Sequence, residues 1–320
     1  MIRREFIRNS AILGMGLVGT TALVSNSGMY QAKTKRKVFR ILSSKGVNVG
    51  TLPVIRAFAG DHTDHVSPYV LFDEFGPVTV QAGADPLRVD AHPHAGVTPT
   101  TYFLNGSGHH KDSLNYDFQI AQGDFMLFNS GRGAIHMEES GKSLYDQGGA
   151  YHGFQIWLNT PAQYKFMDPS TEVHRVDQMG KIETKDYSIQ VVLGELMGQK
   201  STVRTLSPAF YYHVKMNPDS RLDIPTDPTH NAFLYLVDGE LELEGARALK
   251  KHQVVLYQRG DDLINLYAAQ GAEFLVLGGQ PLNERVYSYG PFVMNNEQQI
   301  KQCIRNYNQG LMGDPAVVNL

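Results

Sequence analysis

The chain of 320 residues contains a single cysteine, Cys303, and carries no strong excess of charge of either sign. One cysteine excludes an internal disulfide and a cysteine-rich zinc or iron–sulfur site, so nitrogen and oxygen atoms would have to hold any metal. Lysine and arginine number 29 against 32 aspartates and glutamates. No basic stripe lies in the body of the sequence, which argues against a nucleic-acid partner because phosphate binding needs clustered positive charge.

Long apolar runs are scarce as well. The run at residues 11–24 falls short of the about 20 apolar residues that a membrane-spanning helix requires. It follows three arginines and precedes small polar residues, and the stretch RREFI at residues 3–7 resembles a twin-arginine signal, which exports folded proteins. We expect an export signal at residues 1–30, a linker at 31–38, and a periplasmic or otherwise exported protein with no stable membrane span after processing. An uncleaved N-terminal anchor is the alternative.

The rest of the sequence is typical of an all-β protein. Short runs rich in aromatic and β-branched residues alternate with glycine, proline, asparagine and aspartate, which predicts a sandwich or barrel. The pattern occurs twice, at residues 39–165 and 186–294, with a charged linker predicted at 166–185. In the second series, Asp238-Gly239 lies between two apolar runs and predicts a tight hairpin.

Residues 295–320 predict a C-terminal helix and tail. Asn295 or Asn296 can cap the helix. Apolar residues then recur at helical spacing, which indicates an amphipathic helix that packs against one of the barrels with its cysteine buried; they are Ile300, Cys303, Ile304, Tyr307 and Leu311.

Two pairs of side chains in the first series can chelate a metal. His92 and His94 flank Pro93, and residues i and i+2 of a strand project from the same face. His136 and Glu138 repeat this spacing after a glycine-rich turn. Three imidazoles and one carboxylate from two strands suit one divalent metal of the middle first row and leave coordination positions open.

The remaining histidines are interpreted as hydrogen-bonded core or surface residues, because a lone histidine has such a role more often than it binds a metal. His152 is the best candidate for a residue that contacts a metal ligand without binding the metal itself. His230 is the one histidine at a comparable position in the second series, so we predict no metal site there. The full set interpreted in this way is His62, His65, His109, His110, His152, His174, His213, His230 and His252.

Several segments together resemble the pirin family. They are HPH with Gly96 two residues later, GDFMLFNSGRGAIHMEES, HGFQIWLN, YGPFVMNNEQQI and, upstream, SPYVLFDEFGP. The resemblance implies two tandem cupin barrels, that is, double-stranded β-helices or jelly rolls, with a C-terminal helix and a metal in the N-terminal barrel. It also places the family's metal ligands on His92, His94, His136 and Glu138, and iron(II) is the metal it implies.

The resemblance implies two possible functions. One is a metal-dependent dioxygenase that acts on a small aromatic substrate such as the flavonol quercetin with dioxygen, with Glu138 as the catalytic base. The other is a non-catalytic, redox-sensing or partner-binding protein; a purely stabilising metal would be a third role. The chain departs from many relatives at residues 96–99, where GVTP replaces Gly-Phe-Glu-Thr. We expect a monomer.

The twin-arginine interpretation is testable. Replacing Arg3 and Arg4 with lysine should trap the precursor in the cytoplasm, because the pair carries the signal for folded-protein export. Cell fractionation with detection of the processed form measures this. Normal appearance of the processed protein in the envelope would contradict the interpretation.

Overall fold

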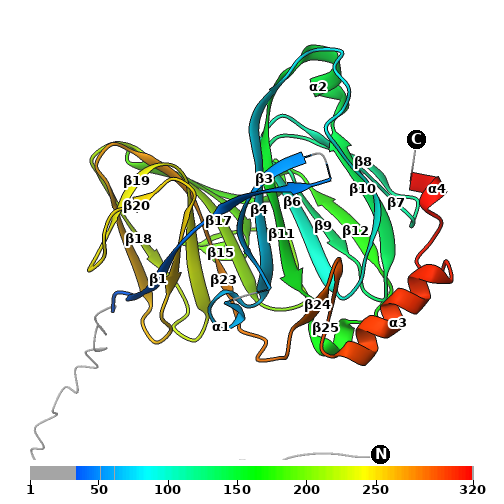
Figure 1. The fold of residues 1–320 in the computed structure, drawn as a ribbon. Coiled ribbons are helices and arrows are strands. Elements are labelled where there is room, and N and C mark those ends of the chain that lie inside the picture. Colours follow the sequence, from blue (N-terminus) through cyan, green and yellow to red (C-terminus); the bar gives the residue numbers. More distant parts are fainter. Residues whose placement is uncertain (1–33, 51, 61, 319–320) are drawn as a thin grey trace, which may run out of the picture. The chain divides into compact units, whose positions relative to one another are not determined.

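The computed structural model describes residues 34–50, 52–60 and 62–318, so the predicted export signal lies outside the described residues. None of the helices in this described part combines the length and apolar character that crossing a lipid bilayer requires. The chain forms two β barrels in succession, followed by a short helical tail (Figure 1). The structure thus confirms the prediction of an all-β protein with tandem barrels.

The N-terminal barrel consists of two facing sheets. The smaller sheet has the order β5-β10-β7-β8, with β5 (Arg88–His94), β10 (Ala134–Ser140), β7 (Gly108–Asp112) and β8 (Asp117–Ile120). The larger sheet has the order β12-β9-β6-β11-β4-β3-β2. Its strands are β12 (Ser170–His174), β9 (Phe125–Asn129), β6 (Val97–Asn105), β11 (Gly149–Asn159), β4 (Tyr69–Val80), β3 (Leu52–Ala59) and β2 (Lys45–Val49).

The C-terminal barrel is built around one branched sheet. Its main path is β1 (Val38–Ser43), β21 (Gln253–Tyr257), β19 (Asn231–Leu243), β23 (Ala272–Gly279), β17 (Ala209–Met216), β14 (Tyr187–Leu193) and β13 (Gly180–Glu183). The strands off this path are β18 (Ser220–Pro225), β20 (Leu249–Lys250) and β22 (Leu263–Ala268). Two small hairpins are β15 (Glu195–Leu196) with β16 (Gln199–Lys200), and β24 (Tyr287–Tyr289) with β25 (Phe292–Met294).

Strand pairing moves several of the predicted boundaries. Residues 39–43, assigned from the sequence to the first barrel, belong to β1, which pairs with β21 of the second barrel. The predicted linker at 166–185 contains β12, which pairs with β9, and β13, which pairs with β14. Charged side chains made this segment look like a linker, but these are edge strands, and an edge strand exposes one side to solvent.

The hairpin predicted at Asp238-Gly239 is wrong. Strand β19 runs through both residues, and Gly239 pairs with Ala272 of β23. The pairing register shifts between Leu236 and Asp238, and Gly239 has a φ of 82°. Positive φ, which serves a tight turn in a hairpin, here serves a bulge that lets a long strand bend.

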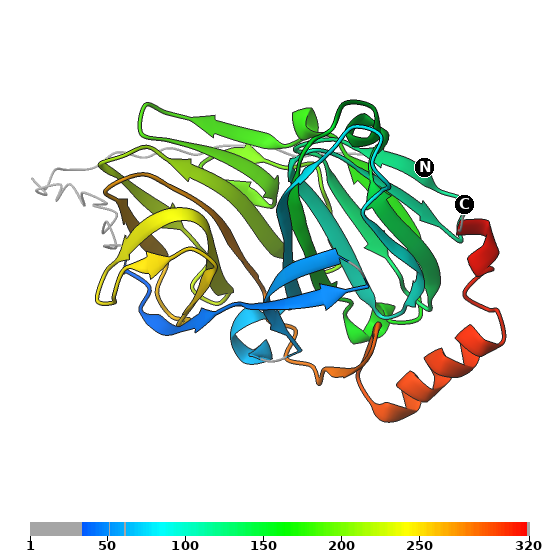
Figure 2. The same cartoon turned by 45° about the horizontal axis from the view of Figure 1, so that its top comes forward.

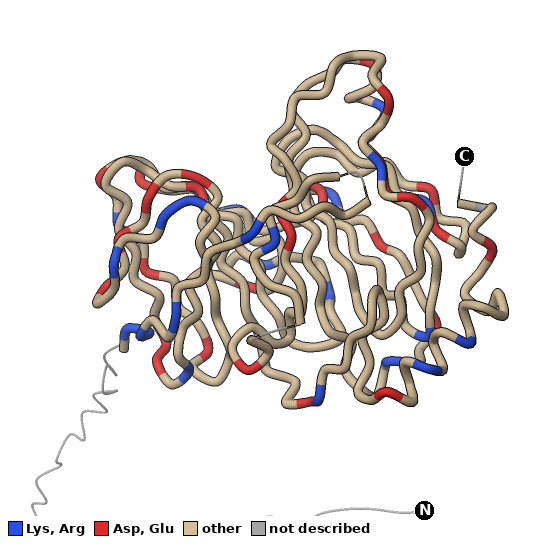
Figure 3. Tube along the Cα trace, in the orientation of Figure 1, with Lys and Arg blue, Asp and Glu red and all other residues tan. Residues whose placement is uncertain are grey.

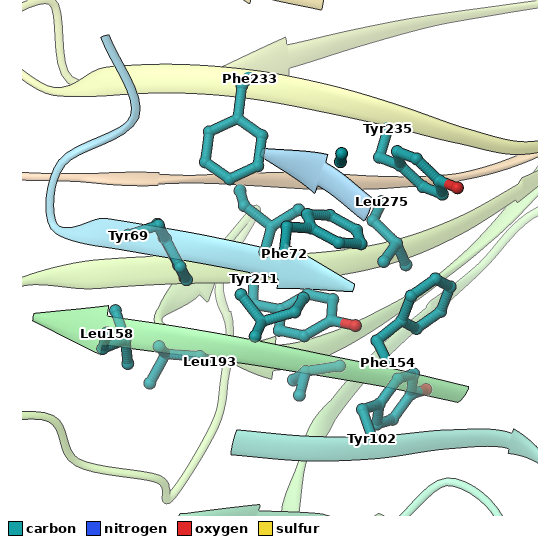
Figure 4. Packing of buried hydrophobic residues seen from close by; sticks show 14 of the residues in the cluster. Tyr69, Phe72, Tyr102, Phe154, Leu158, Leu193, Tyr211, Phe233, Tyr235 and Leu275 are labelled. Atoms are coloured by element: carbon teal, nitrogen blue, oxygen red, sulfur yellow. The ribbon is translucent and has the colours of Figure 1, made fainter. Parts of the chain in front are cut away.

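The two barrels share a core. Phe72 of β4 and Phe154 of β11 pack against Phe233 and Tyr235 of β19, with Tyr69 edge-on to Phe233 at 5.4 Å between ring centroids (Figure 4). Strand β4 is buried along its first seven residues because one face meets the second barrel and the other faces the interior of the first. The stretch is mostly apolar, as expected for a strand buried on both faces, and its two charged residues, Asp73 and Glu74, both have polar partners.

Polar contacts also cross this boundary. The buried carboxylate of Glu74 accepts hydrogen bonds from His152 at 2.7 Å, from His252 at 2.8 Å and from the hydroxyl of Tyr235. His152, predicted to support a metal ligand, therefore serves the contact between the barrels instead. Elsewhere, charged residues of both signs are interspersed along the chain (Figure 3).

The helical tail returns to the N-terminal barrel. Helix α3 (Glu297–Asn308) begins after Asn296, whose side-chain oxygen accepts a hydrogen bond from the backbone of Gln299 at 2.9 Å. Ile300 and Cys303 are buried in a cluster with residues of β10, which confirms the predicted packing, whereas Tyr307 and Leu311 are exposed. Figures 1 and 2 show α3 beside this barrel. The other helices are α1 (Thr63–Val66), α2 (Lys142–Gln147) and α4 (Pro315–Val318).

A carboxylate of the second barrel should control part of the acid stability. Glu273 accepts a hydrogen bond from His213 at 2.8 Å and lies 3.1 Å from the ammonium of Lys215. Burial alone would raise the pKa of Glu273, but His213 and Lys215 together lower it to about 2. Burial also lowers the pKa of His213, so the imidazole is neutral at pH 7 and gains its charge only in acid.

Because the folded pKa lies below the ordinary value of 4.5, Glu273 stabilises the fold above pH 4.5 and loses this contribution as the pH falls toward about 2. The variant Glu273→Gln should therefore show a shallower fall in the free energy of unfolding across this window, measured by urea denaturation at several pH values. Glu183→Gln, which removes an exposed partner of Lys181, is the control. Parallel curves for wild type and Glu273→Gln would contradict the assignment.

Candidate metal centre

Three of the four predicted ligands converge between β5 and β10. The pairing register places His92 opposite His136, and His94 lies two residues further along β5. The Nε2 atoms of His92 and His136 are 3.0 Å apart, and the ligand atoms of all three histidines lie within 4.8 Å of one another. Metal–nitrogen bonds of about 2.0–2.1 Å at right angles separate two nitrogens by about 3 Å, so the spacing fits a single metal ion.

Each of these imidazoles has a hydrogen-bond partner for its other nitrogen. Nδ1 of His92 faces the carbonyl oxygen of Asp90 at 2.7 Å, and Nδ1 of His94 faces the carbonyl oxygen of Pro291 at 3.2 Å. A carbonyl can only accept, so these partners assign the proton to Nδ1 and leave the Nε2 lone pair to the metal. Burial, reinforced by the nearby His92, lowers the pKa of both His94 and His136 well below its ordinary value. Neutral imidazole is the form that ligates metals.

Glu138 does not belong to the group of three histidines. Its carboxylate is grouped with His136 and His110, and not with His92 and His94. Its two oxygens accept hydrogen bonds from the Thr101 hydroxyl at 2.9 Å and from the Gln155 amide nitrogen at 2.6 Å. These donors draw the carboxylate toward the large sheet, so the predicted set of four ligands is brought together only in part.

The sequence interpretation missed His110. This histidine pairs with Glu138 across β7 and β10, and its Nδ1 lies 3.4 Å from Nδ1 of His136. Its Nε2 lies 3.1 Å from the Asp112 carboxylate, which also accepts a hydrogen bond from Thr171. A proton on Nε2 of His110 leaves Nδ1 to accept from His136, which in turn frees Nε2 of His136 for the metal. The i, i+2 spacing of His110 and Asp112 was the available signal.

The metal centre opens into a cavity of about 440 Å³ between the two sheets of the N-terminal barrel. His92, His94 and Glu138 lie on its wall. Most of the other lining side chains are apolar, and Trp157, the sole tryptophan of the chain, contacts His94 edge-on at 4.8 Å between ring centroids. A concave, mainly apolar cavity with a few polar groups is the usual form of a small-molecule site.

The C-terminal tail contributes to this centre. Pro291, which orients His94, precedes β25, and this strand bridges to Ala95. The ammonium of buried Lys165 fastens the contact, because it donates to the carbonyl oxygens of Gly96 and Val293 at 2.7 Å each and to Asn159 at 2.5 Å. Gly96 is required here, since its φ is 70° and a Cβ atom would lie 2.2 Å from the Val293 oxygen.

The departure at residues 96–99 does not touch the ligands. The buried hydroxyl of Thr98 donates to Asn129 at 2.8 Å, and Thr98 is absent from the cavity wall. Neighbouring positions in β6 alternate between the two faces, and it is Thr101, three residues on, that contacts Glu138. The loss of a glutamate at position 98 therefore leaves the described cluster intact.

The second barrel contributes no residue to either cluster of possible metal ligands found in the described part of the chain. Its His230 lies 3.9 Å from Asp227, and its carbonyl oxygen accepts from Arg36. The absence of a metal site from the C-terminal barrel stays a prediction.

The chain of hydrogen bonds behind His136 should set its affinity for metal. In Asp112→Asn an amide nitrogen can replace the oxygen facing His110, which would reverse both donors and place a proton on Nε2 of His136. We expect metal affinity to fall by about 10–100-fold with the fold retained. Chelator competition with zinc(II) measures this, and His230→Ala should bind as wild type does. Equal affinity in Asp112→Asn would contradict the chain of hydrogen bonds.

Comparisons with known proteins agree with this architecture. Residues 51–158 match the family model described as Pirin, and residues 211–313 match the Pirin C-terminal cupin domain. A pirin-like protein of Solanum lycopersicum is 30% identical over 282 residues, which cover 87% of this chain and 93% of that protein.

Solved structures are similar as well. A quercetin 2,3-dioxygenase from Acinetobacter baumannii superposes with a TM-score of 0.85 at 26% identity, covering 88% of this chain and 100% of that one. A bacterial pirin from Escherichia coli, solved in complex with nickel(II), has a TM-score of 0.58 at 18% identity, with 76% and 99% covered. The chain therefore belongs to the pirin family and has its fold of two tandem cupin barrels.

Proposed function

We propose that this protein is a metal-dependent dioxygenase of the pirin type that cleaves flavonol-like substrates such as quercetin with dioxygen, and that its metal is iron(II). The observation that carries the proposal is the position of the three histidines, whose ligand atoms lie within 4.8 Å of one another beside a mainly apolar cavity that His92 and His94 line. The similarity to a quercetin 2,3-dioxygenase from Acinetobacter baumannii supports the substrate class. The predicted export signal supports a periplasmic location, which we also propose.

The residues of the cavity suit an aromatic substrate. Its volume of about 440 Å³ lies within the range of roughly 300–1,000 Å³ that is common for small-molecule sites. Apolar side chains from both sheets would surround the rings, among them Leu71 and Phe103 of the large sheet and Val89 of the small sheet. When bound, iron(II) would supply a Lewis acid for the substrate hydroxyl and electrons for the reaction with dioxygen.

Glu138 is placed to accept the proton of that hydroxyl. Thr101 and Gln155 hold its carboxylate at the cavity wall, where it can act as a general base. The same two hydrogen bonds limit its rotation, so the proton acceptor keeps a fixed position relative to the histidines. His94 is fixed by the carbonyl of Pro291, and Trp157 packs against its ring.

Substitutions should separate metal binding from turnover. Mutation of His94 or His136 to alanine should abolish both metal binding and turnover, because the two imidazoles that remain are too few to hold the metal. Glu138→Gln should retain part of the metal but lose about 100-fold or more of the activity, since an amide oxygen can coordinate but the amide cannot take a proton. His230→Ala, in the second barrel, is the matched control.

Quercetin consumption under air, followed by its absorbance together with oxygen uptake in the iron-reconstituted protein, is the measurement. The panel should include nickel(II), manganese(II), cobalt(II) and copper(II), because imidazole ligates all of them. Absence of oxygen uptake with every metal and with a range of flavonols and catechols would contradict the proposal and favour a metal-bearing sensor without turnover.

A further inference from the structure

A row of polar side chains crosses the floor of the cavity formed by the large sheet. The register pairs Thr101 of β6 with Gln155 of β11, Gln155 with Asp73 of β4, and Asp73 with Arg56 of β3. All four residues line the cavity. We call Thr101, Gln155, Asp73 and Arg56 the polar row.

The rows on either side of the polar row are apolar. Trp157 pairs with Leu71 on one side, and Phe75 pairs with Val54 on the other, next to Phe103. A flat aromatic molecule lying on this floor would therefore have its faces and edges in apolar contact. The oxygen atoms of such a molecule could form hydrogen bonds with the polar row.

Two buried polar atoms of the floor have no hydrogen-bond partner among the described residues. They are Oε1 of Gln155, an acceptor, and Nε1 of Trp157, a donor. Both belong to side chains at the cavity wall and come from the same face of β11. Both atoms have almost no accessible surface, so neither faces the cavity as the side chains stand. The polar groups that the floor offers to a ligand are therefore those of Arg56 and Asp73.

The spacing of the polar row sets the length of that ligand. Gln155 holds the Glu138 carboxylate beside the histidine cluster, and Arg56 lies two strands away on β3. Neighbouring strands are about 4.8 Å apart, so the backbone positions of Gln155 and Arg56 are separated by about 10 Å. A ligand that reaches from the metal centre to Arg56 must therefore extend well beyond a single aromatic ring.

The end of the polar row farthest from the histidines is an ion pair in which one nitrogen of the arginine remains unpaired within the described part of the chain. Nε and Nη2 of Arg56 donate to the two carboxylate oxygens of Asp73 at 2.8 and 2.6 Å, and Nη1 has no partner among the described residues. A ligand carboxylate placed here would be attracted by Arg56 but repelled by Asp73. A hydroxyl group suits the pair better, because it can accept from Nη1 and donate to the remaining lone pairs of Asp73.

We propose that the floor of the cavity binds a polyphenol made of a fused ring system and a pendant ring, with Arg56 and Asp73 recognising the hydroxyl groups on the ring distant from the metal. This inference rests on the proposed function for the position of the reacting ring. It adds a criterion for the substrate, since a flavonol without hydroxyls on its pendant ring leaves the ion pair without a partner.

Binding can be measured without turnover in protein loaded with zinc(II), which is redox-inert. Quenching of Trp157 fluorescence reports on the cavity directly, because the chain has no other tryptophan. The probes are quercetin, the same flavonol without pendant-ring hydroxyls, and a flavonol with a carboxylate on that ring. We expect quercetin to bind at least about tenfold more tightly than either of the others, the ratio that a single charge-assisted hydrogen bond provides.

The double variant Arg56→Gln with Asp73→Asn replaces the ion pair with two uncharged side chains. It should remove the preference by weakening the binding of quercetin alone. Arg56→Lys, which keeps the charge beside Asp73, guards against misfolding and should show an intermediate preference. Arg132→Gln removes an exposed ion pair with Asp168 outside the cavity and should bind as wild type does.

Equal binding of the three probes to the wild type, tighter binding of the carboxylate probe, or a preference that persists in the double variant would each overturn the inference. The proposed function fails separately. Protein that prefers quercetin but consumes no oxygen with any metal contradicts the dioxygenase and leaves the binding site, whereas turnover of all flavonols without preference contradicts the binding site alone.

Discussion

The candidate metal centre depends on one chemical constraint: a neutral imidazole offers its Nε2 lone pair to a metal only in the tautomer with the proton on Nδ1, and a hydrogen-bond acceptor at Nδ1 favours that tautomer. The structure provides three such partners of different origin. A carbonyl of the same strand serves His92, a carbonyl of the C-terminal tail serves His94, and a second histidine serves His136. Because each partner comes from a different part of the chain, assembly of the centre requires most of the N-terminal barrel and the tail to be folded.

The partner of His94 brings the chain back from the second barrel to the candidate metal centre. Once β23 is complete, the chain returns to the first barrel, and Pro291 and β25 pack against the segment that follows His94. The ammonium of Lys165, buried among three acceptors, holds that contact. A buried ammonium without such partners would be costly, so the tail and Lys165 stabilise each other's positions.

The sequence predicted the features that have a local pattern. The strand runs of the two barrels, the capped helix at Asn296 and the pairs His92 with His94 and His136 with Glu138 each follow from spacing within one segment. Features that depend on pairing between distant segments were not predictable in this way. His110 looks like any strand histidine until β7 is placed beside β10, and β1 belongs to the second barrel although it precedes the first. The twin-arginine signal lies outside the described residues and stays a prediction.

The second barrel contributes to the site although it holds none of the candidate ligands. Each of three residues in the polar row has a neighbour in sequence that packs in the core shared by the barrels: Tyr102 follows Thr101, Phe154 precedes Gln155, and Phe72 precedes Asp73. Alternation along a strand sends the polar side chain into the cavity and the aromatic one into that core. The C-terminal barrel thus supports the back of the cavity floor. A floor fixed from behind keeps its polar groups at constant separation, as the proposed recognition of a ligand along the polar row requires.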